Sequence, residues 1–306
     1  MRVHVCPHIV IKYNILLKNI RTAMIKSIWK NLLFYPFLNI LLVLYAITGG
    51  SLGWAVIIIA TLIRLALIPM TRRQYELTAK MAKLKPEIEK LQKKHKGNKE
   101  AFAKAQMELY KDVGYNPLGC MASFIPQFLM LGAIFAVIRA ITKDDLTGVY
   151  PIVRQTFFDN ADKIVINTSF MGMDLAMAPK EILRSVSWNT AQALPYIFMI
   201  ILVGVSQYLA TKFTQSMTQI SRQNSNTKKK KTNADDPMSQ EEMQQQMAKS
   251  MSTIFPLMIM YFSYSSPSVL GIYWFVQSWL LVLQYFMIDR KTAIEVFGNM
   301  FGKRRD

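Results

Sequence analysis

The sequence has few of the side chains from which catalytic and metal sites are usually built. It contains 2 cysteines and 3 histidines in 306 residues. Cys6 and Cys120 lie far apart and form no CxxC pair, and the histidines have no acidic or cysteine neighbours at ligand spacing. These absences argue against a disulfide framework, a metal site and a catalytic constellation. We therefore expect no cofactor and no enzymatic activity.

Acidic residues are also scarce. The chain has 19 Asp and Glu against 37 Lys and Arg, which gives a formal net charge of +18, and yet 52% of its residues are hydrophobic. The apolar residues occur in blocks, and the charges lie between the blocks. This pattern is typical of a polytopic membrane protein, because each spanning helix needs roughly 20 apolar residues. We predict an all-α fold with a five-helix transmembrane core, a cytoplasmic helical hairpin, and an N-terminal interfacial helix or sixth span.

The N-terminal 31 residues contain basic residues but no acid. The apolar run at 32–48 has no small-residue cleavage site of the A-x-A type, which argues against a cleaved secretory signal. The leader would also fit an organelle transit peptide, or would be absent if Met24 is the true start. If 32–48 spans the membrane, there are six spans and both termini are cytoplasmic. If it lies in the outer interface, there are five spans.

Charge places the segments relative to the membrane. Basic residues accumulate at 71–117, 212–231 and 290–305, whereas 142–187 is nearly charge-balanced. Because basic loops stay in the cytoplasm, we expect the three basic segments inside and the balanced one outside. In chain order, the predicted segments are a basic leader (1–31), an interfacial helix or short span (32–50), span one (51–72), a cytoplasmic hairpin (73–117), span two (118–141), an outer loop (142–188), span three (189–212), a flexible cytoplasmic connector (213–249), span four (250–264), span five (268–289) and a basic tail (290–306).

The segment after span one has the pattern of two amphipathic helices. Apolar residues recur at intervals of three and four from Leu77 to Leu91, and again after a break at "HKGNK". A helical period interrupted by a glycine turn predicts an antiparallel helical hairpin. Pro86 is expected to kink or restart the first arm.

One charge lies inside span one. Between Trp54 and Met70 the only charged residue is Arg64, about eight residues or roughly 12 Å before the basic end of the helix. A charge at the centre of a span costs on the order of 2.5–3.5 kcal/mol. Within the other predicted spans, residues 118–141, 190–211, 251–264 and 269–288 contain no Asp or Glu, which disfavours a salt bridge between spans. Arg64 therefore either snorkels to the headgroups or faces a water-filled groove, and we favour the groove.

Polar residues in the other spans have spacings that align them with such a groove. Side chains four or seven residues apart share one face of a helix. They either line the groove or form interhelical hydrogen bonds, which are worth about 0.6 kcal/mol each. The candidate groove residues are Arg64, Ser123, Gln127, Gln207, Thr211, Tyr273, Trp274, Gln277 and Gln284.

Four stretches carry a family resemblance. In chain order they are "ATLIRLALIPMTRRQ", "AKMAKLKPEIEKLQKKHKGNKE", "ELYKDVGYNPLGCMASFIPQF" and "SSPSVLGIYWFVQSWLLVLQ". Their order and spacing resemble the YidC insertase family, with its mitochondrial and chloroplast relatives, over about residues 32–290. The chain departs from the family pattern at two serines. Ser123 stands where the family often has proline, and Ser278 stands where the family has asparagine. It also has Ala210, Thr211 and Lys212 close to the basic end of span three, where the family usually shows a glutamine.

The resemblance implies a groove that is open to cytoplasm and lipid and closed on the outer side. Such a groove receives the hydrophilic flank of a nascent membrane protein and releases the apolar span into the bilayer. The hairpin would recruit clients through Lys83, Lys85, Lys90, Lys93 and Lys94. The implied partners are nascent membrane proteins and the lipid bilayer, with the ribosome, the signal-recognition machinery and the Sec translocase as further candidates. The implied location is the bacterial plasma membrane, with organelle inner and thylakoid membranes as alternatives.

Two other functions are compatible with an arginine in a span. A small transporter or channel could use Arg64 as an anion site, but it would need an inverted repeat or paired broken helices, and the sequence has no internal repeat. An assembly chaperone would hold membrane subunits without translocating them. Crosslinking from position 64 to a stalled nascent chain would separate these functions from insertion.

Overall fold

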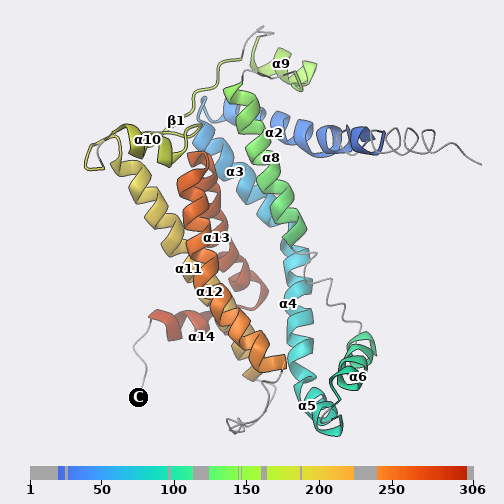
Figure 1. Ribbon diagram of the computed structural model, residues 1–306. Coiled ribbons are helices and arrows are strands. Elements are labelled where there is room, and N and C mark those ends of the chain that lie inside the picture. Colours follow the sequence, from blue (N-terminus) through green and yellow to red (C-terminus); the bar gives the residue numbers. More distant parts are fainter. Residues whose placement is uncertain are drawn as a thin grey trace, which may run out of the picture.

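The computed structural model describes residues 20–24, 27–95, 98–112, 124–143, 145, 147–159, 164–186, 188–223 and 240–301. Most of these residues are helical, and the described strands form one two-stranded hairpin. The prediction of an all-α fold is confirmed. Figure 1 shows α3 (Leu52–Ala66), α11 (Leu194–Gln223), α12 (Gln240–Ser265) and α13 (Ser268–Ile288) as a bundle of long helices. Helix α2 (Tyr35–Ile47) lies crosswise at one end, and α5 (Lys85–Lys94) and α6 (Lys99–Asp112) lie at the other.

Several described helices are suited to a bilayer. The helices long and apolar enough to cross it are Ile20–Ile47, Leu194–Met217 and Ser268–Ile288, and the bent pair Leu52–Ala66 and Ile68–Leu77 also qualifies as one span. Shorter apolar helices cover Leu129–Thr142 and Thr253–Ser265. The protein is therefore a polytopic membrane protein, as its composition predicts.

The N-terminal helix is tied to a distant loop. A π-helical stretch η1 (Trp29–Phe34) continues into α2 (Tyr35–Ile47), which ends where Gly49 and Gly50 adopt positive φ angles. Asn39, buried in α2, donates from Nδ2 to the Gly148 carbonyl at 2.9 Å, and its Oδ1 accepts from the Tyr150 N–H at 2.7 Å. These bonds hold the middle of α2 against the segment that follows α8 (Phe124–Thr142).

The first span is broken close to its end. Helix α3 (Leu52–Ala66) and helix α4 (Ile68–Lys83) meet at Leu67 with a bend of 48°. Pro69 explains the break, because it has no N–H to donate to the Leu65 carbonyl and its ring crowds that carbonyl. The bend falls three residues after Arg64.

The helical hairpin extends from α4. Helix α5 (Lys85–Lys94) begins next to Pro86, and helix α6 (Lys99–Asp112) follows the segment that contains Gly97. Proline suits the first turn of a helix, where its missing N–H would be unpaired in any case. The substantial contacts of α5 and α6 are with each other and with α4, so the hairpin projects from the bundle (Figure 1).

The loop between α8 and α11 covers one end of the bundle. It follows α8 (Phe124–Thr142) and contains α9 (Pro151–Phe157), β1 (Ser169–Phe170), β2 (Met173–Asp174) and α10 (Pro179–Ser185). The Asn167 N–H donates to the Tyr45 hydroxyl at 2.8 Å, and the Asp174 N–H donates to the Tyr196 hydroxyl at 2.7 Å. Phe170 packs on Gly53 and, edge to face, on Trp54. The loop therefore contacts α2, α3 and α11.

The C-terminal part contains four helices. They are α11 (Leu194–Gln223), α12 (Gln240–Ser265), α13 (Ser268–Ile288) and α14 (Arg290–Phe301). The ends of the expected connector, 213–249, thus extend α11 and α12, and much of the expected basic tail is the helix α14. The main core joins α2, α3, α8, α11 and α13, while a second apolar cluster packs α14 on α11.

Candidate functional site

Arg64 lies in the last turn of α3, just before the break at Leu67. Its side chain is half-buried, and its Nε is buried without a hydrogen-bond partner among the described residues. The ion pair found in the described part of the chain joins Arg72 to Glu76, and it lies on the exposed surface of α4. No described acid therefore neutralises Arg64.

Helix α13 supplies the side chains that face this arginine. The Tyr273 and Tyr285 phenol groups lie in the neighbourhood of the Arg64 guanidinium. Tyr273, Trp274, Gln277 and Gln284 are all buried. Tyr273, Gln277 and Gln284 share one face of α13, because steps of four and seven residues return to the same side of a helix.

Gln277 joins α13 to α3. Its Nε2 donates to the Ala60 carbonyl at 3.1 Å, one turn before Arg64. Both helices are well packed at this level, and Gln277 is 8% exposed. The side chain therefore makes an interhelical hydrogen bond next to the arginine.

Gln207 joins α11 to α13 in a similar way. The Ser278 hydroxyl donates to Gln207 Oε1 at 2.9 Å, and the Thr211 hydroxyl bonds the Gln207 carbonyl of its own helix at 2.7 Å. Ser278 is absent from the candidate groove residues. The available signal in the sequence was its position next to Gln277. Two consecutive residues of a helix point in different directions, so Gln277 can contact α3 while Ser278 contacts α11.

Gln284 is the least satisfied polar residue of α13. It is 2% exposed, and neither its Nε2 nor its Oε1 has a hydrogen-bond partner among the described residues. An unpaired amide in an apolar environment costs about 1–3 kcal/mol per group, so such groups usually bind water or a ligand. Arg64 and Gln284 are thus the groove candidates with unpaired buried atoms.

The remaining candidate residues are only partly described. Ser123 lies outside the described residues, and for Gln127 the structure describes only the helical backbone of α8. In the hairpin, Lys90 and Lys94 are exposed, whereas the side chains of Lys83, Lys85 and Lys93 lie outside the described set. In the parts of the chain that the structure places, no three His, Cys, Asp or Glu residues could hold a metal ion together.

A second polar contact lies at the hairpin end of the bundle, and the sequence reasoning missed it. The Tyr75 hydroxyl of α4 donates to Asp289 Oδ2 at 2.7 Å. Partial burial raises the pKa of Asp289, but the hydrogen bonds from Tyr75 and Thr292 outweigh burial and hold that pKa below its ordinary value. The two residues are 214 positions apart, so nothing local in the sequence indicates the contact.

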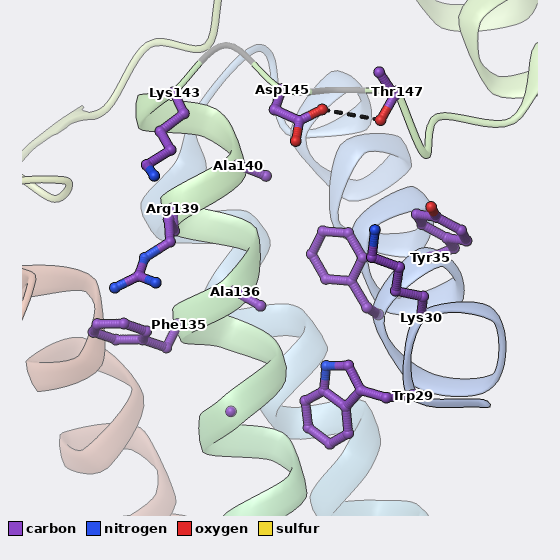
Figure 2. Close-up of a pocket in the computed structure, with 12 residues that line it drawn as sticks. Trp29, Lys30, Tyr35, Phe135, Ala136, Arg139, Ala140, Lys143, Asp145 and Thr147 are labelled. Carbon is purple, nitrogen blue, oxygen red and sulfur yellow. Dashed lines mark hydrogen bonds between the residues drawn. The ribbon is translucent and has the colours of Figure 1, made fainter. Parts of the chain in front are cut away.

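A pocket of ≈ 370 Å³ lies between η1 and α8. Figure 2 shows Trp29 and Lys30 on the η1 side and Ala136 and Ala140 on the facing side of α8, while Arg139 leaves α8 on another flank. None of the residues that line this pocket belongs to α3, α11 or α13. The pocket is therefore separate from the surroundings of Arg64.

Comparison with known proteins identifies the relatives. The family described as 60Kd inner membrane protein matches residues 43–295. The chain is similar to the membrane protein insertase YidC of Fusobacterium nucleatum subsp. nucleatum, with 27% identity over 246 residues (80% of this chain and 89% of the relative). It is 26% identical over 278 residues to YidC of Alkalihalophilus pseudofirmus (88% and 85%). It is 28% identical over 247 residues to the inner membrane ALBINO3-like protein 2, chloroplastic, of Chlamydomonas reinhardtii (80% and 51%).

Proposed function

This chain belongs to the 60Kd inner membrane protein family, the family of YidC-type insertases, and we propose that it inserts nascent proteins into the bacterial plasma membrane through a hydrophilic groove whose positive pole is Arg64. The proposed site comprises Arg64, Ser123, Gln127, Gln207, Thr211, Tyr273, Trp274, Gln277 and Gln284. The observation that carries it is the half-buried Arg64, which has an unpaired Nε and no described acidic partner.

The electrostatic role of Arg64 follows from its position. A cation in a span usually faces a partner or a water-filled cavity, because its charge is costly in hydrocarbon. An acidic flank of a client would supply the missing counter-charge while it crosses the membrane. The break at Leu67 places Arg64 near the end of α3 from which the hairpin extends, so the client would meet the arginine soon after entering from the cytoplasm.

Release needs no nucleotide in this mechanism. The apolar span of the client moves from the groove into the bilayer, and burial of apolar surface contributes about 25 cal/mol per Å². The exposed apolar residues Ile254, Leu257 and Tyr261 on α12 show that this helix presents an apolar face outside the bundle. We further propose that the basic hairpin, with Lys90 and Lys94 exposed, recruits the client and contacts the ribosome, the signal-recognition machinery or the Sec translocase.

The test replaces Arg64 by alanine and by lysine in proteoliposomes. Arg64→Ala should slow the insertion of a client with an acidic outer tail by about tenfold or more, which corresponds to ~1.4 kcal/mol. Arg64→Lys should retain part of the rate, because the charge is kept. A client whose tail acids are changed to Gln and Asn should depend less on Arg64.

Arg73→Ala is the matched control, since Arg73 is an exposed arginine beyond the break. Equal insertion rates for Arg64→Ala and the unmodified protein, at equal protein levels, would disprove the electrostatic role.

A further inference from the structure

Asp289 connects three helices, two of them through its carboxylate and one through its backbone N–H. Its Oδ2 accepts the Tyr75 hydroxyl of α4 at 2.7 Å, and its Oδ1 accepts the Thr292 N–H at 3.2 Å, which caps the start of α14. Its backbone N–H donates to the Tyr285 carbonyl at 2.9 Å, at the end of α13. The residue that ends α13 and begins α14 therefore also holds α4.

The helices on one side of this contact form a packed unit. Ala293 and Val296 of α14 are fully buried against Phe213 and Met217 of α11. Phe213 stacks on Phe286 of α13, with ring centroids 5.8 Å apart and an interplanar angle of 22°. Because α11, α13 and α14 share this cluster, Asp289 is fixed relative to the bundle.

The helix on the other side carries the hairpin. Tyr75 lies in α4 and also packs edge to face on Tyr285, with ring centroids 6.0 Å apart. Beyond this level, the substantial contacts that α5 and α6 make among the described residues are with each other and with α4. The angle of α4 at Tyr75 therefore sets the direction of the whole hairpin. A small rotation at this point is amplified along the roughly 12 Å of helix between Tyr75 and Lys83.

We infer that the Tyr75–Asp289 hydrogen bond is a latch that positions the helical hairpin relative to the bundle, with α14 as the element that holds the carboxylate in place. Tyr75 and Asp289 are positioning residues in this inference. The functional consequence rests on the proposed function, because it takes the hairpin to be the element that captures clients. A hydrogen bond to a charged acceptor is stronger than one between neutral groups, which suits a contact that must resist the leverage of the hairpin.

The test uses variants that remove the bond and little else. Tyr75→Phe deletes the hydroxyl and keeps the ring on Tyr285. Asp289→Ser keeps an oxygen that can cap α14 but leaves none for Tyr75. Tyr110→Phe is the matched control, because it deletes a hydroxyl that accepts from Gln106 Nε2 within α6 itself.

The first measurement is the distance between spin labels at Lys94→Cys and Lys212→Cys, in a Cys6→Ser/Cys120→Ser background reconstituted in lipid. Both labelled positions are exposed, one in the hairpin and one in α11. Tyr75→Phe and Asp289→Ser should each shift or broaden the distance distribution, and Tyr110→Phe should leave it unchanged. An unchanged distribution in Tyr75→Phe, or an equal change in Tyr110→Phe, would overturn the inference.

The second measurement is insertion at increasing client concentration. Loss of the latch should raise the half-saturating client concentration about tenfold, near the lower end of what a lost hydrogen bond to a charged group allows, with the maximal rate retained. The double variant should be no worse than the more affected single variant, because both changes delete the same bond. If the increases in half-saturating client concentration multiply in the double variant, the two residues act independently and the latch is contradicted.

The two proposals fail separately. If Arg64→Ala leaves insertion unchanged while Tyr75→Phe still moves the labels, the groove is disproved and the latch stands. If Arg64→Ala slows insertion while Tyr75→Phe moves nothing, the latch is disproved and the groove stands.

Discussion

The polar residues around Arg64 fall into two groups according to whether their atoms are paired. Gln277 bonds the Ala60 carbonyl, and Gln207 bonds Ser278, so these glutamines act as interhelical contacts in the structure. Arg64 and Gln284 have buried polar atoms with no described partner. In the sequence, each polar residue could either line the groove or form an interhelical hydrogen bond. In the structure, Gln277 and Gln207 form such bonds, so the groove proposal depends mainly on Arg64 and Gln284.

A single glycine in α3 allows the loop to pack on the span. A Cβ atom on Gly53 would overlap the Phe170 ring of β1. We expect Gly53→Ala to lower the free energy of unfolding by about 1–3 kcal/mol, because overpacking forces the ring or the helix to move. Thermal unfolding in detergent, followed by circular dichroism, measures this effect.

Gly298→Ala in α14 is the matched control. A Cβ there would meet nothing within 4 Å, so the change should stabilise the helix by about 0.5–1 kcal/mol through its propensity alone. If both variants shift the midpoint of thermal unfolding equally, the close contact between Gly53 and Phe170 does not contribute to stability.

At the scale of whole elements, three attachments organise the molecule around the bundle. The hairpin is attached through α4, the helix α14 through its cluster with α11, and the helix α2 through Asn39. Each attachment combines these side-chain contacts with apolar packing on the bundle. Substitutions at these points should therefore move an element without unfolding the bundle.

Asn39→Ala tests the attachment of α2. The change leaves the Gly148 carbonyl and the Tyr150 N–H without their partner, and a buried unsatisfied group costs about 1–3 kcal/mol. We expect a lower unfolding midpoint and faster proteolysis in the segment after α8. Asn31→Ala is the control, because Asn31 is exposed and bonds Ser27 one turn earlier in the same helix. Equal proteolysis of both variants would show that Asn39 does not anchor the loop.

At the scale of the whole molecule, the orientation of the N-terminal helix decides between five and six spans. By length and composition, Ile20–Ile47 could cross a membrane. However, Asn39 in the middle of α2 bonds residues that directly follow α8, and Figure 1 shows α2 crosswise to the bundle. A helix held at its midpoint beside the end of a span would lie along the membrane surface. We therefore propose the interfacial position and five spans.

Cysteine labelling from each side of the membrane tests this topology. Single cysteines at Asn31, Lys90 and Arg184 would be placed in a background without the native cysteines, and all three positions are exposed. We expect an impermeant reagent to label Asn31 and Arg184 from the outside and Lys90 from the inside. Labelling of Asn31 together with Lys90 would instead show that the N-terminal helix crosses the membrane.

The sequence by itself determined the class of the protein and the location of its unusual charge. Blocks of apolar residues separated by basic segments predict a polytopic helical membrane protein, because the bilayer imposes both the length of a span and the side on which cations remain. The helical period, Pro86 and the glycine turn predict the hairpin, since these are local signals. The position of Arg64 in an apolar run is likewise visible without a structure.

Only the tertiary structure decided which polar groups are paired. The bonds from Gln277 to Ala60 and from Ser278 to Gln207 join different helices, and their donors and acceptors are more than 70 residues apart. The same is true of Tyr75 and Asp289 and of the tie between α2 and the loop after α8. Local sequence carries propensity and periodicity, whereas contacts of this kind depend on how the helices cross. The sequence predicts only a basic tail where the structure has the helix α14. This helix is stabilised by burial against α11, and no local sequence pattern indicates that contact.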